Sequence, residues 1–326
     1  MPTSPDRPNL RRAWFLLFRP WSYTATLVPF LVAAGVGARD PTCLWWRWAV
    51  GLVAGILFQA TVNLLNTWGD ERSGVDDAPG AIRTTPQVHD GLVSMNALLA
   101  VALACAALAA ALGLSLCFCR HEGAWRIDTP LLAAGFIGFL GSTNYSTGVR
   151  FKYRGLGVPF VSFLMGPLET FVALALLKCG LAITSPSALA NLLLLSLPVA
   201  ALVGVILHGN DMRDIPSDRA AGIVTFASWL GPKNALRYYL LCHVLPYAIV
   251  GVRVLFLAIF RTGSCVHPYW GCLPLLALPL SVRTMRAAAA TCRSCPENPP
   301  WRGLERASGA VLLVYGVLYA LSLALV

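Results

Sequence analysis

Charged residues are scarce in this sequence. Asp, Glu, Lys and Arg together make up 12% of the 326 residues, whereas hydrophobic residues make up 57%. Soluble domains carry roughly 25% charged residues. The composition therefore excludes an ordinary soluble enzyme and indicates a protein embedded in a lipid bilayer.

Polar interruptions are missing from nine long apolar runs. A helix needs about 20 predominantly apolar residues to cross a bilayer. The runs also lack the alternation of apolar and polar residues that is typical of a membrane β-barrel, so their backbone groups must be satisfied within helices. We predict an all-α, polytopic membrane protein with nine transmembrane helices. The predicted spans are about 21–37, 46–68, 92–118, 130–146, 156–178, 188–208, 234–258, 268–288 and 308–326. We expect one domain over residues 1–326, with residues 1–13 as a flexible tail.

A small-residue cleavage site is missing after the basic N-terminal residues, so we expect no cleavable signal peptide. Basic residues set the orientation of membrane helices, because they favour the cytoplasmic side. With nine spans and the N-terminus inside, eighteen of the 25 Lys and Arg residues fall on the inner side and the other seven on or near the outer side. The net charge of +10 is then a topological bias, reinforced by anionic lipid head groups, and we expect no nucleic acid partner.

A second Cys or His pair is missing near Cys292 and Cys295, so these two residues make only a weak metal or redox motif. The ten cysteines are scattered, mostly inside predicted spans, where they behave as small apolar residues. Cys265 and Cys272 fall in one outer loop and could pair if that side is oxidising.

Two polar clusters stand out at the inner ends of the second and sixth predicted spans. Residues of each cluster are spaced at i, i+3 and i+7, which places them on one face of a helix. The first cluster is Asn63, Asn66 and Asp70, and the second is Asp211, Asp214 and Asp218. Both lie on the same side of the membrane.

These clusters have a structural and a functional interpretation. Inner loops are polar because they contact water, and pairs such as Asp70 with Arg72 or Asp218 with Arg219 could be surface ion pairs. Two matched triplets at membrane helix ends favour function instead. Carboxylate and amide oxygens bind Mg²⁺, which can bridge them to a diphosphate that they would otherwise repel. The basic residues Arg83, Lys152 and Arg154 could neutralise the remaining phosphate charge.

At these motifs the sequence resembles the UbiA superfamily of intramembrane aromatic prenyltransferases. The stretch NLLNTWGDERSGVD from Asn63 matches the first Asp-rich motif of that family, and NDMRDIPSDRAAGIVT from Asn210 matches the second. The stretches RPWSYTATLVPFL from Arg19, FKYRGLG from Phe151 and MGPLE from Met165 are most similar to the vitamin K and menaquinone branch. The resemblance implies nine helices bundled around a central cavity.

The residues and the resemblance together imply Mg²⁺-dependent transfer of a polyprenyl group from prenyl diphosphate to an aromatic acceptor, a naphthoquinone precursor. The residues assigned to Mg²⁺ are Asn66, Asp70, Asp211, Asp214 and Asp218. Those assigned to substrate binding are Asn63, Asn66, Asp76, Arg83, Tyr145, Arg154, Asn210, Asp211, Arg213 and Arg219. Those assigned a catalytic role are Asp70, Lys152, Glu169, Asp214 and Asp218.

Two positions depart from the family pattern. Val158 follows Gly157 where the branch usually has Asp, and Glu169 follows the Gly-Pro-Leu turn where relatives carry a small apolar residue. An acidic side chain within a membrane span is energetically costly. It is usually retained because it reaches the interface, pairs with another group or has a function. We predict that Glu169 positions or deprotonates the acceptor. Tyr145 and Trp68 are candidates to face the allylic cation, although Trp68 also fits the interfacial aromatic belt.

Other functions remain open from the sequence alone. Within the superfamily the acceptor could be a hydroxybenzoate, a chlorophyllide, haem or a glycerol phosphate. A secondary transporter would also carry intramembrane acids, but it places its site near the bilayer midplane rather than at helix ends on one side. The membrane could be a bacterial plasma membrane, or a eukaryotic endomembrane or mitochondrial membrane, with the active-site loops on the cytoplasmic side.

Overall fold

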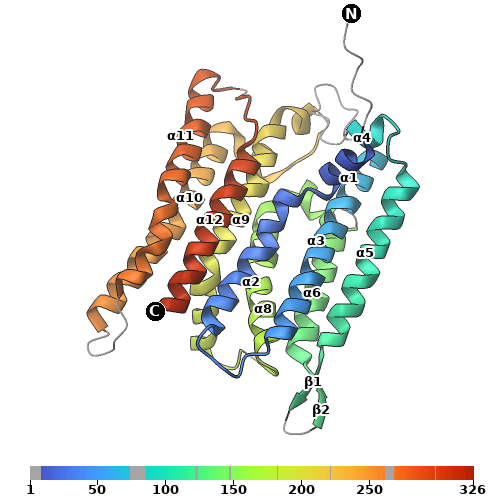
Figure 1. Ribbon diagram of the computed structural model, residues 1–326. Helices are drawn as coiled ribbons and strands as arrows, with labels where there is room; N and C mark the ends of the chain where they lie inside the picture. Colours follow the sequence, from blue (N-terminus) through green and yellow to red (C-terminus); the bar gives the residue numbers. More distant parts are fainter. Residues whose placement is uncertain are drawn as a thin grey trace, which may run out of the picture.

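The computed structural model describes residues 9–73, 86–121, 124–146, 148–181, 183–220, 222–260, 268–297 and 299–326. Long helices pack side by side into one bundle (Figure 1). In these described ranges, seven helical segments are long and apolar enough to cross a membrane. They are Leu10–Gly37, Trp45–Gly69, Met95–Leu116, Gly157–Leu177, Pro186–Ala220, Phe226–Phe256 and Leu304–Leu325. The prediction of a polytopic helical membrane protein is confirmed in its class.

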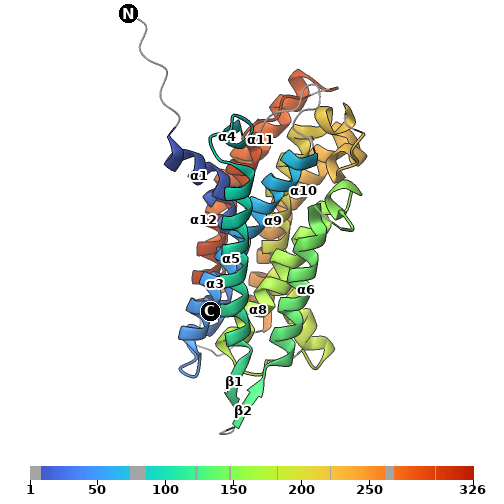
Figure 2. The same cartoon turned by 90° about the vertical axis from the view of Figure 1, so that its right-hand side faces the viewer.

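Two of the nine predicted spans are not among these seven. One corresponds to α6 (Thr129–Ser146), and the other to η5 (Pro268–Ala277) followed by α11 (Leu278–Ser294). Both run alongside the other helices (Figures 1 and 2). Their sequences explain the difference, because α6 ends in a polar run at residues 142–144 and α11 carries Arg283, Arg286 and Arg293.

The N-terminal part is more ordered than predicted. Asn9 caps α1 (Leu10–Phe18) by accepting a 3.0 Å hydrogen bond from the Arg11 amide. A short 3-10 turn, η1 (Pro20–Tyr23), joins α1 to α2 (Thr24–Gly37). Leu17 is fully buried in a cluster with Leu64 of α3 (Trp45–Ser73). Residues 10–13 are therefore helical, and their prediction as flexible tail is wrong; residues 1–8 lie outside the described part.

Small residues let the central helices approach closely, as is common where lipid removes the hydrophobic drive between helices. A Cβ on Gly35 of α2 would come within 2.3 Å of the Ala320 carbonyl oxygen in α12 (Leu304–Leu325). The main core cluster joins α2 and α12 to α9 (Pro186–Ala220) and α10 (Phe226–Phe260). On the other side of the bundle, α5 (Met95–Leu116) packs along α3.

The fifth predicted span is built from three consecutive helical segments. They are α7 (Gly157–Phe163), the π-helical turn η4 (Leu164–Leu168) and α8 (Glu169–Leu177). Pro167 lies inside η4. Because proline has no N–H to donate and its ring crowds the preceding turn, a widened turn is a natural way to accommodate it.

The two ends of the bundle differ. Helices α3, α6 and α9 finish at the end that also carries α1 and α4 (Pro86–His89), which we call the motif end (Figure 1). At the opposite, hairpin end, β1 (Phe118–His121) pairs antiparallel with β2 (Ala124–Ile127) (Figure 2). This hairpin is the one departure from the predicted all-α fold within the described ranges.

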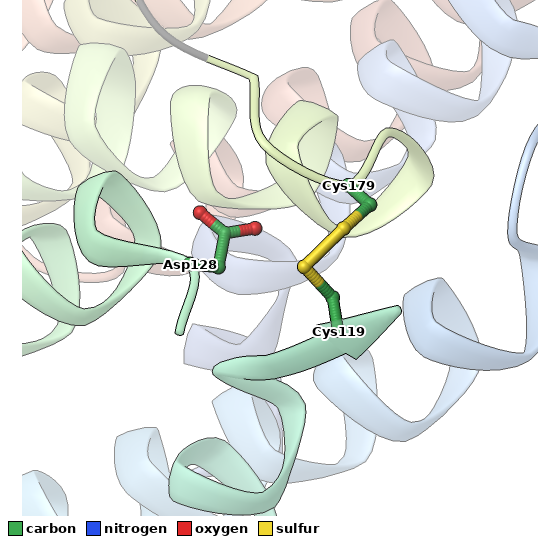
Figure 3. Close-up of side chains that lie close together, drawn as sticks. All are labelled: Cys119, Asp128 and Cys179. Atoms are coloured by element: carbon green, nitrogen blue, oxygen red, sulfur yellow. A yellow bond between two sulfur atoms is a disulfide. The ribbon is translucent and has the colours of Figure 1, made fainter. Parts of the chain in front are cut away.

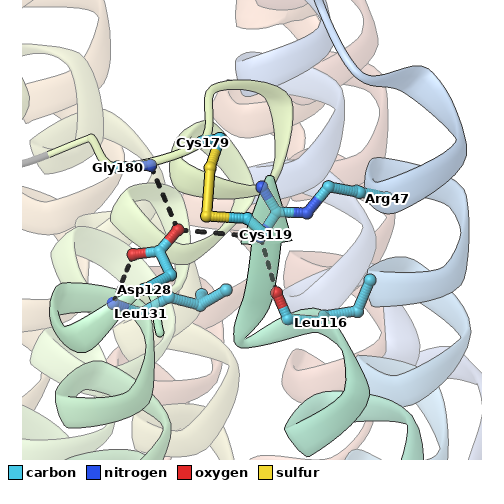
Figure 4. The surroundings of a disulfide bond; sticks show 7 residues. All are labelled: Arg47, Leu116, Cys119, Asp128, Leu131, Cys179 and Gly180. Atoms are coloured by element: carbon cyan, nitrogen blue, oxygen red, sulfur yellow. Dashed lines mark hydrogen bonds and ion pairs between the residues drawn. A yellow bond between two sulfur atoms is a disulfide. The ribbon is translucent and has the colours of Figure 1, made fainter. Parts of the chain in front are cut away.

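A buried ion pair closes the hairpin end. Arg47 of α3 and Asp128, just before α6, are 1% and 2% exposed. The Arg47 Nη2 donates to the Leu116 carbonyl at 2.6 Å and lies 3.6 Å from the Asp128 carboxylate. That carboxylate also accepts hydrogen bonds from the amides of Leu131 and Gly180 (Figure 4). The ion pair as a whole therefore connects α3, the end of α5, the start of α6 and the segment after α8. Nearby, Lys178 donates to Asp40 and lowers the pKa of this carboxyl to about 2.

A disulfide lies beside this ion pair. Cys119 of β1 and Cys179, after α8, are bonded across 60 residues of sequence (Figure 4). Both cysteines lie one residue beyond a predicted span, outside the set interpreted as small apolar residues, and their pairing was not predicted. The predicted pairing of Cys265 with Cys272 cannot be followed, because Cys265 lies outside the described residues.

Candidate active site at the motif end

The second polar cluster places two carboxylates in the interior. Asp211 and Asp218, two helical turns apart on α9, are only 6% and 9% exposed. The Lys152 ammonium acts electrostatically on both carboxylates. Burying two like charges is costly unless a cation compensates them. The structure therefore brings together the predicted residues Asp211, Asp218 and Lys152.

Lys152 reaches this position because two loops are joined at the motif end. It lies in η3 (Phe151–Tyr153), between α6 and α7. The Gly155 amide donates to the Val224 carbonyl at 2.8 Å, and Arg154 and Val224 form an isolated parallel bridge. Gly155 has a φ of +72°, a conformation that glycine adopts at little cost. The loop of Lys152 is thus fixed to the last part of the second motif, which follows α9.

Tyr145, one of the predicted substrate contacts, lies beneath the same loop. Its side chain is 6% exposed at the end of α6. A Cβ on Gly157 would lie 3.5 Å from the Tyr145 ring and 3.4 Å from the Cα of Lys152. The aromatic ring is therefore near the Lys152 loop, and its role towards the allylic cation stays a prediction. Trp68 instead lies under the Arg72 guanidinium, 5.0 Å from its ring centre, which agrees with the interfacial interpretation.

Asp214, the middle residue of the triplet, is bound by its neighbour. Arg213 donates from Nε and Nη2 to the two Asp214 oxygens, each at 2.7 Å. The Nη1 of Arg213 donates to Asn210 at 3.3 Å and lies 3.8 Å from the Glu305 carboxylate of α12. Arg213 and Asn210 are both predicted substrate contacts, but in the structure Arg213 donates to Asn210 and to Asp214. An ionised carboxylate still has unused lone pairs, so Asp214 keeps the capacity to bind a metal.

Asp218 is held by the loop that follows it. The Thr225 hydroxyl donates to its Oδ2 at 2.8 Å, and the Ile223 amide donates to its backbone carbonyl at 2.8 Å. Ser228 and Thr225 bond each other reciprocally at the start of α10. The motif sequence therefore folds back on its own carboxylate.

The first motif is described only in part. Asn63 is buried, and its amide donates to the Phe18 carbonyl and the Ser22 hydroxyl, each at 2.9 Å. It thereby anchors the N-terminal segment to α3. Asn66 is half-buried one turn further along and makes an interaction of its own. Asp70 belongs to α3, but its side chain, together with the whole of Asp76 and Arg83, lies outside the described part.

Two predicted substrate contacts lie at the edge of this end. Arg154 is exposed. Arg219 is also exposed and lines a separate open pocket of about 660 Å³, with Lys233 and Glu297 among the other lining residues. A Cβ on Gly231 would lie 3.7 Å from the Arg219 guanidinium, so this side chain extends towards the start of α10.

Glu169 faces the interior of the bundle. Its Oε1 would lie 3.7 Å from a Cβ on Gly55 of α3, and Thr26 of α2 touches the same point. The side chain is half-buried, so it does not extend into lipid. However, Glu169 lies twelve residues along the helix from Gly157, which is about 18 Å at 1.5 Å per residue. The acid is deep in the bundle rather than beside Lys152. Val158, the other departure from the family pattern, is fully buried.

Among the described residues, one group of possible metal ligands lies close together, and it is at the hairpin end. The ligand atoms of Cys119, Asp128 and Cys179 lie within 4.8 Å of one another (Figure 3). Both sulfurs are joined in the disulfide, so neither is a thiolate, and Asp128 is already paired with Arg47. This group is structural.

The donor chemistry at the motif end fits Mg²⁺. Asp211, Asp214 and Asp218 offer carboxylate oxygens, the hard ligands that Mg²⁺ prefers. Asn66 of α3 could add a side-chain amide oxygen, which is also a hard ligand. Asp211, Asp214 and Asp218 face two described cations, Lys152 and Arg213, so an excess of negative charge remains, which a divalent cation would balance.

Comparison with known proteins decides the family. The model of the UbiA prenyltransferase family matches residues 26–296, which is most of the chain. The chain belongs to the UbiA prenyltransferase family. It is an integral membrane prenyltransferase, and the resemblance seen in the motifs is confirmed.

Relatives of this UbiA protein include animal proteins named UbiA prenyltransferase domain-containing protein 1. The human protein is 30% identical over 272 residues, which cover 82% of this chain and 73% of the human one. The chicken protein is 31% identical, with 82% and 74% covered. A solved UbiA homologue from Archaeoglobus fulgidus, bound to GPP and Mg²⁺, superposes with a TM-score of 0.60 at 16% identity and covers 96% of this chain and 100% of its own. At this low identity, the superposition shows a shared fold and nothing more.

Sequence reasoning missed Glu305 as a neighbour of the site. It lies 92 positions after Arg213, and a single acid in the first turn of the last helix resembles an ordinary helix-end charge. Thr225 was part of the second motif, but its bond to Asp218 could not be foreseen without the loop geometry.

Proposed function

We propose that this UbiA protein transfers a polyprenyl group from prenyl diphosphate to an aromatic acceptor in a Mg²⁺-dependent reaction. The observation that carries the proposal is the pair Asp211 and Asp218, buried at the motif end and opposed by Lys152. Solved UbiA homologues bound to GPP or DMAPP with Mg²⁺ support the same class of donor.

The acidic residues bind the metal in this proposal. Asp211, Asp214 and Asp218 on α9 would hold Mg²⁺ together with Asn66 and Asp70 on α3. When bound, Mg²⁺ supplies Lewis-acid stabilisation of the diphosphate leaving group. Two motifs at the same end of different helices are suited to hold a diphosphate between them.

Basic and aromatic side chains act on the two halves of the donor. The Lys152 ammonium binds diphosphate oxygens and stabilises the negative charge that develops on the leaving group. Arg83 has the same role in the proposal. The buried Tyr145 ring, close to the Lys152 loop, presents an aromatic face to the allylic carbon as positive charge develops there. The apolar bundle beneath excludes water from that cation.

The acceptor in this proposal is a naphthoquinone precursor, as in menaquinone or vitamin K synthesis. This assignment is supported by the resemblance of the stretches RPWSYTATLVPFL, FKYRGLG and MGPLE to that branch, together with the similarity to the animal relatives. Other aromatic acceptors are the competing outcomes of the test.

The same proposal includes the full topology. We propose nine transmembrane helices, with α6 and η5–α11 as the two spans beyond the seven apolar segments. The motif end faces the cytoplasm. Two observations support this orientation independently: the excess of basic residues at the motif end, and the disulfide of Cys119 with Cys179 at the opposite end, because disulfides persist in oxidising compartments.

The test is a transfer assay with the purified full chain and a radiolabelled prenyl diphosphate. A panel of acceptors is offered: dihydroxynaphthoate, hydroxybenzoate, haem, a chlorophyllide and glycerol phosphate. We expect label to be transferred to the naphthoate most efficiently. Efficient transfer only to another acceptor of the panel would contradict the naphthoate assignment, but it would still show that the protein is a prenyltransferase. No transfer with any donor, by protein shown to be folded, would contradict the proposed function.

A further inference from the structure

A glycine lets the start of the last helix approach the second motif. A Cβ on Gly209 of α9 would lie 3.2 Å from both the Glu305 amide nitrogen and the Leu304 Cβ. Any larger residue would push the N-terminus of α12 away. Arg213 is four residues after Gly209, so it lies on the same face of α9, the face that meets α12.

Across this contact three charged side chains form a row. The Glu305 Oε1 lies 3.8 Å from Arg213 Nη1, and Arg213 donates two 2.7 Å bonds to Asp214. The Arg213 and Glu305 side chains are 14% and 13% exposed, so solvent screens their interaction only partly. The Glu305 Oε2 is buried and has no hydrogen-bond partner among the described residues. Within these residues, Arg213 is therefore its compensating cation.

The row limits where Arg213 can move. Its guanidinium donates from Nε and Nη2 to Asp214, while Nη1 is directed at Asn210 and Glu305. Arginine has five N–H donors in a fixed planar fork, so anchoring both sides fixes the whole group. The carboxylate of Asp214 is then fixed in turn. The first turn of α12 stabilises the Glu305 charge, because helix N-termini favour anions.

We infer that Glu305 is a positioning residue for the reaction: acting through Arg213, it orients Asp214 for the divalent cation. The inference rests on the proposed function, because it assumes that this cluster binds a metal. Arg213 is then a holder of Asp214 rather than a contact of the diphosphate. Removing the Glu305 charge leaves Asn210 as the described partner of Nη1. The guanidinium then loses its charged anchor on the α12 side, which loosens Asp214 and weakens metal binding without touching a metal ligand.

The test measures Mn²⁺ binding by electron paramagnetic resonance, with the purified full chain and no prenyl substrate. Glu305→Gln keeps the shape and removes the charge, and Glu297→Gln is the matched control, since Glu297 is an exposed acid. We expect about a five- to twenty-fold rise in the Mn²⁺ dissociation constant for Glu305→Gln and no change for Glu297→Gln. Thermal unfolding of each variant is followed in parallel.

A double-mutant cycle separates positioning from simple helix anchoring. If Glu305 acts through Arg213, Glu305→Gln should add little to the loss already caused by Arg213→Gln. Unchanged Mn²⁺ binding in Glu305→Gln, with or without lowered thermal stability, would overturn the inference. If that variant does not fold, Glu305→Asp replaces it and should show a smaller shift in the same direction; no shift would overturn the inference equally. Absence of Mn²⁺ binding by the wild type would instead refute the proposed metal site.

Discussion

The Thr225 hydroxyl donates a 2.8 Å hydrogen bond to the Oδ2 of Asp218. Both residues are almost fully buried, and the bond fixes one oxygen of a carboxylate that sits near Asp211 and Lys152. The loop after α9 thus orients the carboxylate at the end of the second motif, in the same way that Arg213 orients Asp214.

Replacing Thr225 by Val should therefore impair the enzyme with little change of shape. The variant leaves an oxygen of Asp218 without its donor, and a hydrogen bond to a charged group is worth about 1.5–3 kcal/mol. We expect kcat/KM for prenyl diphosphate to fall about ten- to a hundred-fold. Thr225→Ser keeps the hydroxyl and should retain most of the activity. Equal kinetics of the Val and Ser variants would show that the bond is not needed.

Lys152→Ala should lower kcat/KM for every prenyl donor by about ten- to a hundred-fold, because it would remove the charge-assisted contact that we propose with the diphosphate. Steady-state kinetics with two donors and two acceptors provide the measurement. Lys178→Ala is the matched control, since Lys178 lies at the hairpin end and pairs with Asp40. The assignment would be refuted by a loss that depends on the acceptor offered, or by an equal loss in the control.

Glu169→Gln should impair transfer from long prenyl donors more than transfer from short ones. Glu169 lies twelve residues, about 18 Å of helix, from Gly157. At that depth we expect a long prenyl chain to pass the side chain and a five-carbon chain not to reach it. This differs from the sequence-based hypothesis that Glu169 acts on the acceptor ring. Kinetics with five-carbon and twenty-carbon donors distinguish the two. A raised KM for the acceptor, with either donor, would favour the acceptor role and contradict the one argued from depth.

Loss of the disulfide should reduce stability without altering the active site. It closes a loop of 60 residues, and a native disulfide typically contributes about 2–4 kcal/mol. We expect the Cys119→Ser, Cys179→Ser double variant to unfold at a lower temperature and to keep its KM for prenyl diphosphate. A reductant should lower the melting temperature of the wild type and leave that of the double variant unchanged. A wild type insensitive to reductant, with free thiols detected, would show that the bond does not form in the membrane.

The sequence predicted the residue types of the candidate site better than it predicted the neighbouring residues that hold them in place. Asp211 and Asp218 could be placed together because helical spacing alone puts them on one face, and Lys152 followed from the matching loop. The partner of Arg213 could not be predicted, since an arginine next to an acid can reach either its neighbour or a substrate, and Glu305 approaches only in three dimensions. The disulfide was missed because Cys119 lies just past a predicted span end, where it resembles an apolar residue. The count of spans differed at α6 and α11, whose polar residues make them poor apolar segments although they run with the bundle.

The most direct test of Mg²⁺-dependent transfer at the second motif is a metal titration of the transfer assay. Labelled prenyl diphosphate and the naphthoate acceptor are incubated with the wild type, Asp218→Asn and Asp211→Asn, across a range of Mg²⁺ concentrations after EDTA treatment. Asp90→Asn, an exposed acid at the same end, is the control. We predict no product in EDTA, restoration by Mg²⁺ for the wild type and Asp90→Asn, and at least a hundred-fold loss for the two buried aspartates, of the order seen when an electrostatic catalytic group is removed. Product formation that persists in EDTA, or full activity in Asp218→Asn, would contradict Mg²⁺-dependent transfer at the second motif.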